Sequence, residues 1–293
     1  MAQTQLETWQ AVGRRYRHRD HGIFYREEGQ GVALLLIHGF PTASWDWYRI
    51  WPTLAARYRL IAPDMIGFGY SAKPEDYHYS ILDQADLCEG LLASLSVDEV
   101  HVLAHDYGDT VAQELLARYN ERKAGAGLRL RSMCFLNGGL FPETHRPRLV
   151  QKLLISPLGP LVARLMNRRS FDRSFSAIFG AQTQPSEQEL AEFWDLIRFN
   201  DGVRIFPQLI HYMTERRAHR ERWVGALQNA VIPLRVIDGP DDPVSGRHMV
   251  ERYRELVPNP DTVLLEGIGH YPQVESPQGV LDGYLPFVEA AAR

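Results

Sequence analysis

The sequence predicts an α/β fold in which a mostly parallel sheet is flanked by helices and interrupted by a helical insertion. Short apolar runs typical of buried strands alternate with segments of helical periodicity along most of the chain, which is the pattern of β–α–β units. From residue 138 to residue 229 only helical segments occur, separated by prolines and glycines. We therefore expect a core domain of residues 1–137 and 230–293 and a helical cap domain of residues 138–229.

The amino-terminal part of the core is expected to supply most of the sheet. A loosely alternating stretch from residue 10 to 28, broken by Asp20-His21-Gly22, predicts two antiparallel strands joined by a turn. The uninterrupted apolar run of residues 32–38 is typical of a strand buried on both faces. Further along this part, strands are expected at 59–62, 102–104 and 131–136, and helices at 44–58, at 81–95 and up to Tyr119.

The α/β pattern resumes after the insertion. Residues 233–237 and 262–265 predict two more strands, and residues 246–256 and 280–292 predict two more helices. Together with the earlier runs, these segments give an eight-stranded sheet.

Composition and charge exclude several classes of protein. With 293 residues, 45% hydrophobic and 23% charged, the chain is long and apolar enough to form a globular core. A formal net charge of -4 gives no overall attraction to nucleic acid, and the run from Glu215 to Arg222 is predicted to be a solvated helix face. Cys88 and Cys134 have no metal-binding spacing, so we expect them reduced and expect neither a metal nor a cofactor.

No apolar run approaches the roughly 18 residues that a membrane helix needs. The first five residues also lack the apolar core of a signal peptide. We therefore expect a cytoplasmic protein, a monomer or homodimer, without an integral membrane segment.

The stretch from Val102 to Thr110 carries the strongest functional signal. A short apolar run ends in a small residue, an acid and a glycine, and a helical pattern follows at once. The spacing small-x-Asp-x-Gly is that of a nucleophile elbow, with Asp106 where serine usually stands. Aspartate also favours ordinary turns, so the elbow needs partners elsewhere in the chain to be convincing.

Two later loops supply such partners. In hydrolases with a nucleophile elbow, the catalytic groups follow in the order nucleophile, acid, histidine, each on a loop after a strand. Asp242 and His270 satisfy that order behind Asp106. We predict that Asp242 is the acid, with Asp238 and Asp241 of the same loop as alternatives, and that His270 is the base.

An oxyanion hole is predicted from two backbone N–H groups. One belongs to Tyr107, directly after the candidate nucleophile, and the other to Phe40, in the loop after an earlier strand. Gly39 lets that loop approach the site closely. His38, which precedes it, and Trp194 in the predicted cap are expected at the substrate pocket.

Five stretches carry a resemblance to a known family. On them the chain resembles the epoxide hydrolase and haloalkane dehalogenase branch of the α/β hydrolases, and more closely the mesoderm-specific transcript protein family. The resemblance implies an α/β-hydrolase fold with an inserted helical cap and covers most of the chain. The stretches are His38-Gly39-Phe40-Pro41-Thr42, residues 105–109, residues 137–147, Trp223-Val224-Gly225-Ala226-Leu227 and His270-Tyr271-Pro272-Gln273.

An aspartate nucleophile predicts a particular reaction. Its side chain is ordinarily an anion at pH 7, so it needs no base before it attacks, and a carboxylate attacks saturated carbon well. Asp106 would form an alkyl ester of its own side chain. His270, oriented by Asp242, would then activate the water that hydrolyses this ester.

The leaving group separates the candidate reactions. An epoxide oxygen needs a proton when the ring opens, and Tyr212 and His145 are the candidate donors. A halide needs N–H donors, but the resemblance shows Tyr107 and Phe40 where dehalogenases typically have tryptophan and asparagine. We therefore predict a hydrolase of small hydrophobic epoxides. The alternatives are a haloalkane dehalogenase with an atypical halide site and a non-enzymatic binding protein that keeps the hydrolase shell.

Overall fold

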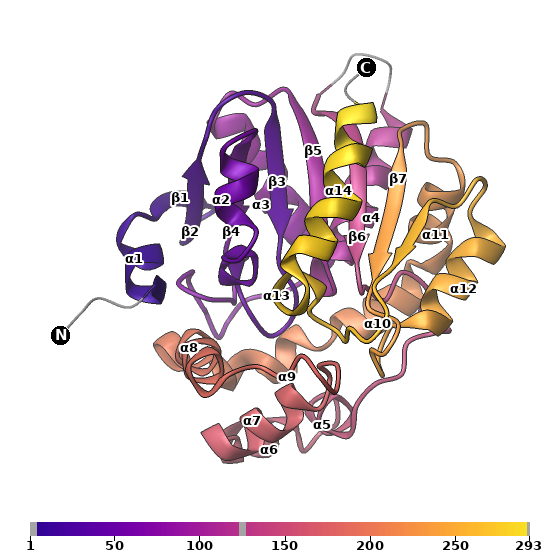
Figure 1. The fold of residues 1–293 in the computed structure, drawn as a ribbon. Coiled ribbons are helices and arrows are strands. Elements are labelled where there is room, and N and C mark those ends of the chain that lie inside the picture. The colour runs from indigo at the N-terminus through magenta and orange to yellow at the C-terminus, as the bar shows by residue number, and fades with distance from the viewer. Residues whose placement is uncertain (1–4, 123–126, 292–293) are drawn as a thin grey trace.

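The computed structural model of the protein describes residues 5–122 and 127–291. Residues 1–4, and Ala292 at the end of the last expected helix, lie outside this range. Within it, eight strands form one sheet in the order β1-β2-β4-β3-β5-β6-β7-β8 (Figure 1). The strands are β1 (Arg14–His18), β2 (His21–Glu28), β3 (Ala33–Ile37), β4 (Arg59–Pro63), β5 (Glu99–His105), β6 (Arg129–Leu136), β7 (Leu234–Asp238) and β8 (Thr262–Leu264).

The sheet is parallel except at one edge. β1 pairs antiparallel with β2, and β2 pairs antiparallel with β4, whereas every later pair of neighbours is parallel. β3 and β5 lie at its centre, and all five residues of β3 are buried. The uninterrupted apolar run of β3 reflects cover on both faces. The predicted eight-stranded, mostly parallel sheet is therefore confirmed.

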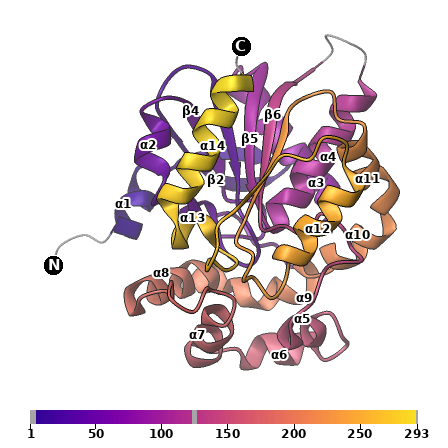
Figure 2. The same ribbon diagram turned by 45° about the vertical axis from the view of Figure 1, so that its right-hand side comes forward.

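Helices cover both faces of the sheet. α2 (Trp51–Ala55) and α14 (Pro277–Ala291) lie on one face, while α3 (Ile81–Ser94) and α4 (Tyr107–Glu121) lie on the other (Figure 2). The remaining core helices are α1 (Gln5–Ala11), the short 3₁₀ helix η1 (Ser44–Trp47), α12 (Arg247–Leu256) and α13 (Pro272–Glu275).

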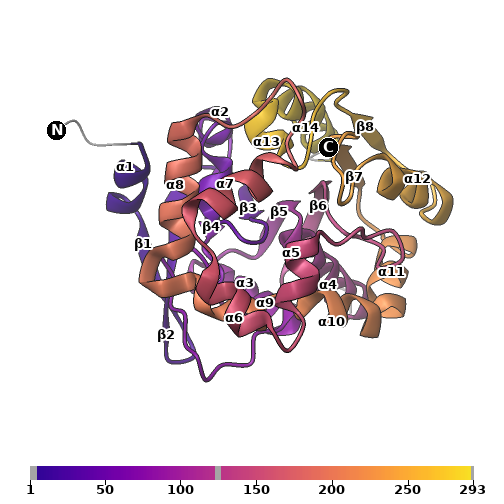
Figure 3. The same cartoon turned by 90° about the horizontal axis from the view of Figure 1, so that it is seen from below.

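The inserted segment 138–229 contains a string of short helices. The first helices, from α5 to α9, lie beyond the carboxyl ends of the parallel strands, whereas α11 packs beside α4 on the flank of the sheet (Figures 1 and 3). The helices are α5 (Leu149–Leu154), α6 (Gly159–Leu165), α7 (Arg168–Ser176), α8 (Glu187–Arg198), η2 (Phe199–Ile205), α9 (Phe206–Leu209), α10 (Tyr212–Ala218) and α11 (Arg220–Gln228).

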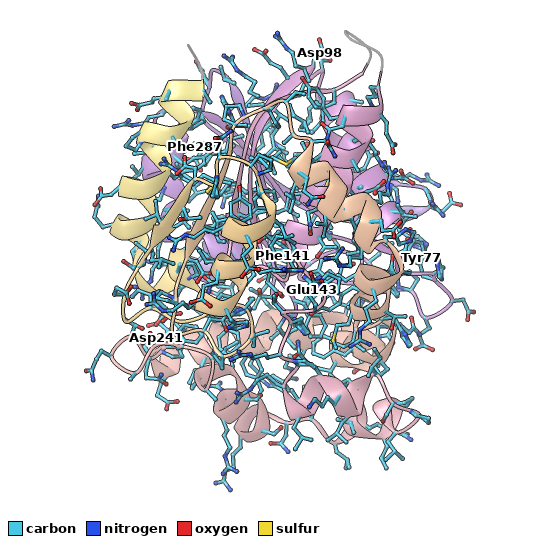
Figure 4. All side chains as sticks on the ribbon, turned by 90° about the vertical axis from the view of Figure 1, so that its right-hand side faces the viewer. Tyr77, Asp98, Phe141, Glu143, Asp241 and Phe287 are labelled. Atoms are coloured by element: carbon cyan, nitrogen blue, oxygen red, sulfur yellow. The ribbon has the colours of Figure 1, made fainter. Side chains whose placement is uncertain are left out.

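Charged side chains join the start of this segment to the core. Glu143 accepts hydrogen bonds from Arg220 at 2.5 and 2.9 Å and from Arg252 at 3.2 Å. Glu143 is labelled near mid-height in Figure 4, well below Asp98 at the amino end of β5. Within the described residues, no helix combines the length and the hydropathy needed to cross a bilayer.

Three helical features differ from the expectations. α1 occupies residues that include the start of the stretch expected to be strand. The helix expected at 44–58 is divided into η1 and α2, because Pro52 has no N–H to donate and therefore occupies the first turn of a new helix. The short helix α13 was not expected, and it begins at Pro272 for the same reason.

One glycine allows α4 to pack closely against the end of β3. A Cβ atom at Gly108 would lie 2.3 Å from the carbonyl oxygen of Ile37 and 2.7 Å from that of His38. Both distances are shorter than any van der Waals contact, and both neighbours are backbone. Gly225 of α11, in contrast, has nothing within 4 Å of the corresponding position.

We expect Gly108→Ala to destabilise the protein by about 1–3 kcal/mol, because α4 or β3 must move to accept the methyl group. Gly225→Ala is the matched control. It should leave stability unchanged or raise it by up to about 1 kcal/mol, because alanine favours helix more than glycine does. Urea denaturation followed by circular dichroism measures both changes, and equal stability of the two variants would contradict the packing argument.

Candidate active site

The turn between β5 and α4 holds Asp106 in an unusual backbone conformation. Its φ is 46° and its ψ is -103°, outside the regions that residues with a Cβ ordinarily occupy. Such strain persists only where the surrounding structure enforces it, and it is common at functional sites. The strand before the turn and the helix after it are both almost fully buried.

Two groups contact the Asp106 side chain directly. The Phe40 backbone N–H donates a hydrogen bond of 3.0 Å to Oδ2. On the other side, Nη2 of Arg216 lies 3.8 Å from Oδ1. One carboxylate oxygen is therefore held by a backbone donor, and the other faces a buried guanidinium.

His270 and Asp242 form a buried pair. Nδ1 of His270 lies 2.7 Å from Oδ2 of Asp242. Asp242 also accepts hydrogen bonds from the backbone N–H groups of Val244 at 2.7 Å and Ser245 at 3.0 Å, and from Nδ2 of Asn137 at 3.2 Å. These contacts fix the orientation of the carboxylate, and the carboxylate fixes the imidazole ring.

Charge controls the protonation of this pair. Burial alone would lower the pKa of His270, but the charge and hydrogen bond of Asp242 and the charge of Asp106 outweigh it and raise that pKa to about 9. Burial alone would raise the pKa of Asp242, but the charge and hydrogen bond of His270 bring it below its ordinary value. The pair is thus an imidazolium and a carboxylate at neutral pH.

The neighbouring aspartates have different surroundings. Both carboxylate oxygens of Asp238 are buried without a partner, and burial raises its pKa well above the ordinary value. Asp241 is exposed. Asp242 is therefore the aspartate of this loop that contacts His270, as its position before Pro243 predicted.

A cavity of about 90 Å³ joins the carboxylate and the imidazole. Its walls are mostly apolar and come from both the core and the inserted helices. The lining residues are Phe40, Pro41, Asp106, Val244 and His270 from the core, and Arg148, Val150, Gln151, Leu154, Met166, Phe171, Ser174, Phe175, Ile178 and Phe206 from the insertion.

The inserted segment also touches the histidine loop. The backbone N–H of His270 donates to the carbonyl oxygen of Ile178 at 2.8 Å. Glu275 accepts hydrogen bonds from the N–H groups of Gly180 at 2.7 Å and Gly269 at 2.9 Å. The loop that carries His270 is therefore bound to the segment that closes the cavity.

Tyr212 and His145, the predicted proton donors, lie beside Asp106 but outside the lining of the cavity. Burial and the charge of Asp106 raise the pKa of Tyr212, and its buried hydroxyl lies near the side chain of Gln151. Both ring nitrogens of His145 are buried without a partner. Burial and the charge of Arg216 lower the pKa of His145 to about 3, so its ring is neutral at pH 7.

Tyr107 and Phe40, the predicted oxyanion-hole residues, both lie next to Asp106, the first along the chain and the second through its backbone N–H. Tyr107 is the first residue of α4, and its ring packs edge-on against Tyr212 with centroids 5.0 Å apart. The side chain of Phe40 lines the cavity, while its N–H points to Asp106.

His38 and Trp194, expected at the pocket, do not line the cavity. Nε2 of His38 accepts from the Met65 N–H at 3.0 Å and its Nδ1 lies 2.8 Å from Gly39 O, so the ring braces the loop from behind. Trp194 packs against Phe171 with ring centroids 5.3 Å apart and faces a different hollow. The spacing of these residues along the chain did not indicate which way either side chain points.

The sequence analysis missed Arg216. It assigned the run from Glu215 to Arg222 to a solvated helix face, but Arg216 is only 2% exposed. It donates to the Asp106 carbonyl at 3.0 Å and to Oγ1 of Thr110 at 2.7 Å, and it lies over the ring of Tyr212. The spacing of Tyr212 and Arg216, four residues apart on one helix face, was the available signal.

The described residues contain no group of three or more histidine, cysteine, aspartate or glutamate side chains arranged to hold a metal ion. Cys88 and Cys134 are both free and buried.

Several known proteins are similar to this chain over most of its length. Residues 32–277 match the family model described as the alpha/beta hydrolase fold. The human mesoderm-specific transcript homolog protein is 44% identical over 97% of this chain and 88% of its own length. The putative hydrolase LipZ of Mycobacterium tuberculosis is 38% identical over 97% of this chain and 98% of its own. The solved structure of the epoxide hydrolase CorEH is 22% identical, with a TM-score of 0.79 over 96% of this chain and 99% of that one.

We expect Arg216→Met to destabilise the protein by about 3 kcal/mol, because it removes two hydrogen bonds that fix the elbow and leaves a buried carboxylate without its cation. Arg217→Met, at the exposed neighbour on the same helix, is the matched control and should change stability by less than about 0.5 kcal/mol. Urea denaturation compares the two variants. Similar midpoints would show that the guanidinium is not important for folding.

Stability should also depend on pH through His270. Its pKa is about 9 in the folded protein, above the ordinary value near 6.5 expected after unfolding. Its contribution is therefore complete below about pH 6.5 and is lost as the pH rises through about 9. The free energy of unfolding of the protein minus that of His270→Gln should fall by on the order of 3 kcal/mol across this window. A difference that stays constant from pH 6 to pH 10 would contradict the charged pair.

Proposed function

Because the chain belongs to the α/β-hydrolase fold family and, within it, groups with the mesoderm-specific transcript proteins, we propose that it is a cofactor-independent hydrolase with Asp106 as nucleophile. The observation that carries this proposal is the cavity that contains both the Asp106 carboxylate and the His270 imidazole. We propose an epoxide as the substrate class. The mostly apolar lining suits a small hydrophobic molecule, with residues 138–229 acting as the cap above it.

In the first half-reaction, Oδ1 of Asp106 attacks a ring carbon of the epoxide. A bond forms between Oδ1 and that carbon, and the bond between the carbon and the ring oxygen breaks. Oδ1 is the better nucleophile of the two oxygens, because Oδ2 already accepts from the Phe40 N–H. The released alkoxide takes a proton from the Tyr212 hydroxyl, which is buried near Asp106 and near Gln151 of the cavity lining.

In the second half-reaction, water attacks the carbonyl carbon of the ester. Negative charge then develops on Oδ2, where the N–H groups of Phe40 and Tyr107 form the oxyanion hole. The water loses its proton to Nε2 of His270 while Asp242 stabilises the imidazolium that forms. The diol leaves, and Asp106 returns to the carboxylate with one oxygen from the water.

The resting charge state supports this order of steps. His270 is protonated at neutral pH partly because the Asp106 carboxylate is negative. Ester formation removes that charge, so the pKa of His270 falls and the ring gives up its proton, which returns through solvent to the Tyr212 phenolate left by the first half-reaction. The base thus becomes available only after the ester that it serves has formed.

The surroundings of the leaving group favour an epoxide over a halide. A halide site needs N–H donors that face the displaced atom, and no tryptophan is among the residues that line the cavity. Trp194, which the sequence analysis expected at the substrate pocket, faces another hollow. A buried phenol close to the nucleophile is the donor that an epoxide oxygen requires.

We expect Asp106→Asn to abolish diol formation from aryl and alkyl epoxides, with a loss of at least about 1,000-fold. His270→Gln should instead stop after the first half-reaction, and mass spectrometry should detect one alkyl group per chain, attached to Asp106. Asp241→Asn, at the exposed aspartate beside Asp242, is the matched control and should retain activity. Undiminished diol formation by Asp106→Asn would refute the proposal.

Tyr212→Phe distinguishes the two leaving groups in the same assay. It should lower the rate of epoxide opening by roughly 100-fold, since an acid catalyst contributes at least that factor. If the protein released bromide from bromoalkanes in an Asp106-dependent way but formed no diol, the haloalkane alternative would replace the epoxide.

A further inference from the structure

Two neighbouring helices of the inserted segment carry an exposed leucine surface. Leu149 and Leu153 lie on α5, Leu158 lies just before α6, and Leu161 and Leu165 lie on α6. Their exposed fractions run from 36% to 73%. Their spacing of three, four or seven residues places the leucines of each helix on one side. We call this surface the α5–α6 face, and both helices lie on the side of the molecule nearest the viewer in Figure 3.

The sequence segment that carries these leucines is rich in positive charge. Residues 146–173 contain seven basic side chains and one acidic side chain, although the whole chain has a net charge of -4. Arg168 pairs with the acidic one, Asp172. The other six have no carboxylate within ion-pair distance among the described residues. These six are Arg146, Arg148, Lys152, Arg164, Arg169 and Arg173.

We propose that the α5–α6 face docks on the surface of an anionic lipid bilayer. Leucines that share their helices with arginine and lysine fit such a surface in two ways. The apolar side chains enter the boundary with the acyl chains, and the cations meet the phosphate headgroups. Leaving five leucines in water has no structural benefit, because none of them contributes to the buried core.

Charge argues against the other occupants of this face. A second copy docked face to face would bring Lys152 and Arg164 toward the same two cations of the other copy, and the like charges would repel. A nucleic acid would use the cations but would leave the leucines without a partner, since its outer surface is phosphate. Glu75 and Asp201, the acids in the hollow beside Arg164, both lie within ion-pair distance of Arg204 and do not offset the excess.

The face and the cavity are built from the same helix. Leu149 and Leu153 of α5 point outward, while Val150, Gln151 and Leu154 of α5 line the cavity that contains Asp106. A bilayer against the α5–α6 face therefore lies one helix away from that cavity. Docking itself does not depend on the reaction proposed above and can be measured without a substrate.

Flotation of the full chain with vesicles tests the proposal. The protein should float with vesicles of phosphatidylcholine containing 30 mol% phosphatidylglycerol and should float poorly with phosphatidylcholine alone. Lys152→Gln with Arg164→Gln should weaken binding to the anionic vesicles by about thirtyfold, because each cation near such a surface contributes about fivefold. Leu161→Ser with Leu165→Ser should weaken it by roughly tenfold.

Two control variants make the same chemical changes elsewhere. Arg57→Gln with Arg129→Gln removes two charges at the amino ends of β4 and β6, and Val231→Ser removes a side chain that is 78% exposed before β7. Neither should change flotation. The proposal is overturned if the protein does not float with anionic vesicles or if the controls lose as much binding as the α5–α6 variants. It is also overturned if the leucine variants abolish self-association in vesicle-free solution, which would assign the face to a second copy.

Discussion

The structure depends on how it holds a buried negative charge at Asp106. A carboxylate removed from water costs several kcal/mol unless charges and hydrogen bonds compensate for it. Three groups do so here: the Phe40 N–H, the Arg216 guanidinium and the His270 imidazolium. They come from the loop after β3, from α10 and from the loop after β8. Three separate parts of the fold therefore stabilise the charge of one side chain.

The fold was largely predictable because its signals are local. Parallel strands buried on both faces appear as uninterrupted apolar runs, and β3 is such a run from Ala33 to Ile37. The turn at Asp106 was equally recognisable in the sequence, because it requires a small residue two positions before Asp106 and a glycine two positions after it.

Helix boundaries at the prolines at 52 and 272 were predicted less accurately. Each begins a new helix, but periodicity alone runs through the first and overlooks the second.

The inserted helices were harder to interpret because tertiary contacts determine what their side chains face. Arg216 resembles its exposed neighbour Arg217 in sequence, and only the packing of α10 against the elbow distinguishes them. Trp194 has the composition of a pocket residue, but its helix turns it toward Phe171 and another hollow. His38 lies one residue from the site, yet its ring supports the loop from behind. The charged and aromatic residues could be picked out from the sequence, but the sequence did not show which way their side chains face.

The hydrogen bond between the His270 N–H and the Ile178 carbonyl joins two segments that lie far apart in the sequence. Ile178 belongs to the wall of the cavity, and Gly180, two residues later, is held by the same glutamate that holds Gly269. The wall of the cavity and the loop of His270 therefore form one hydrogen-bonded unit. The inserted segment thus helps to position a side chain that the core supplies.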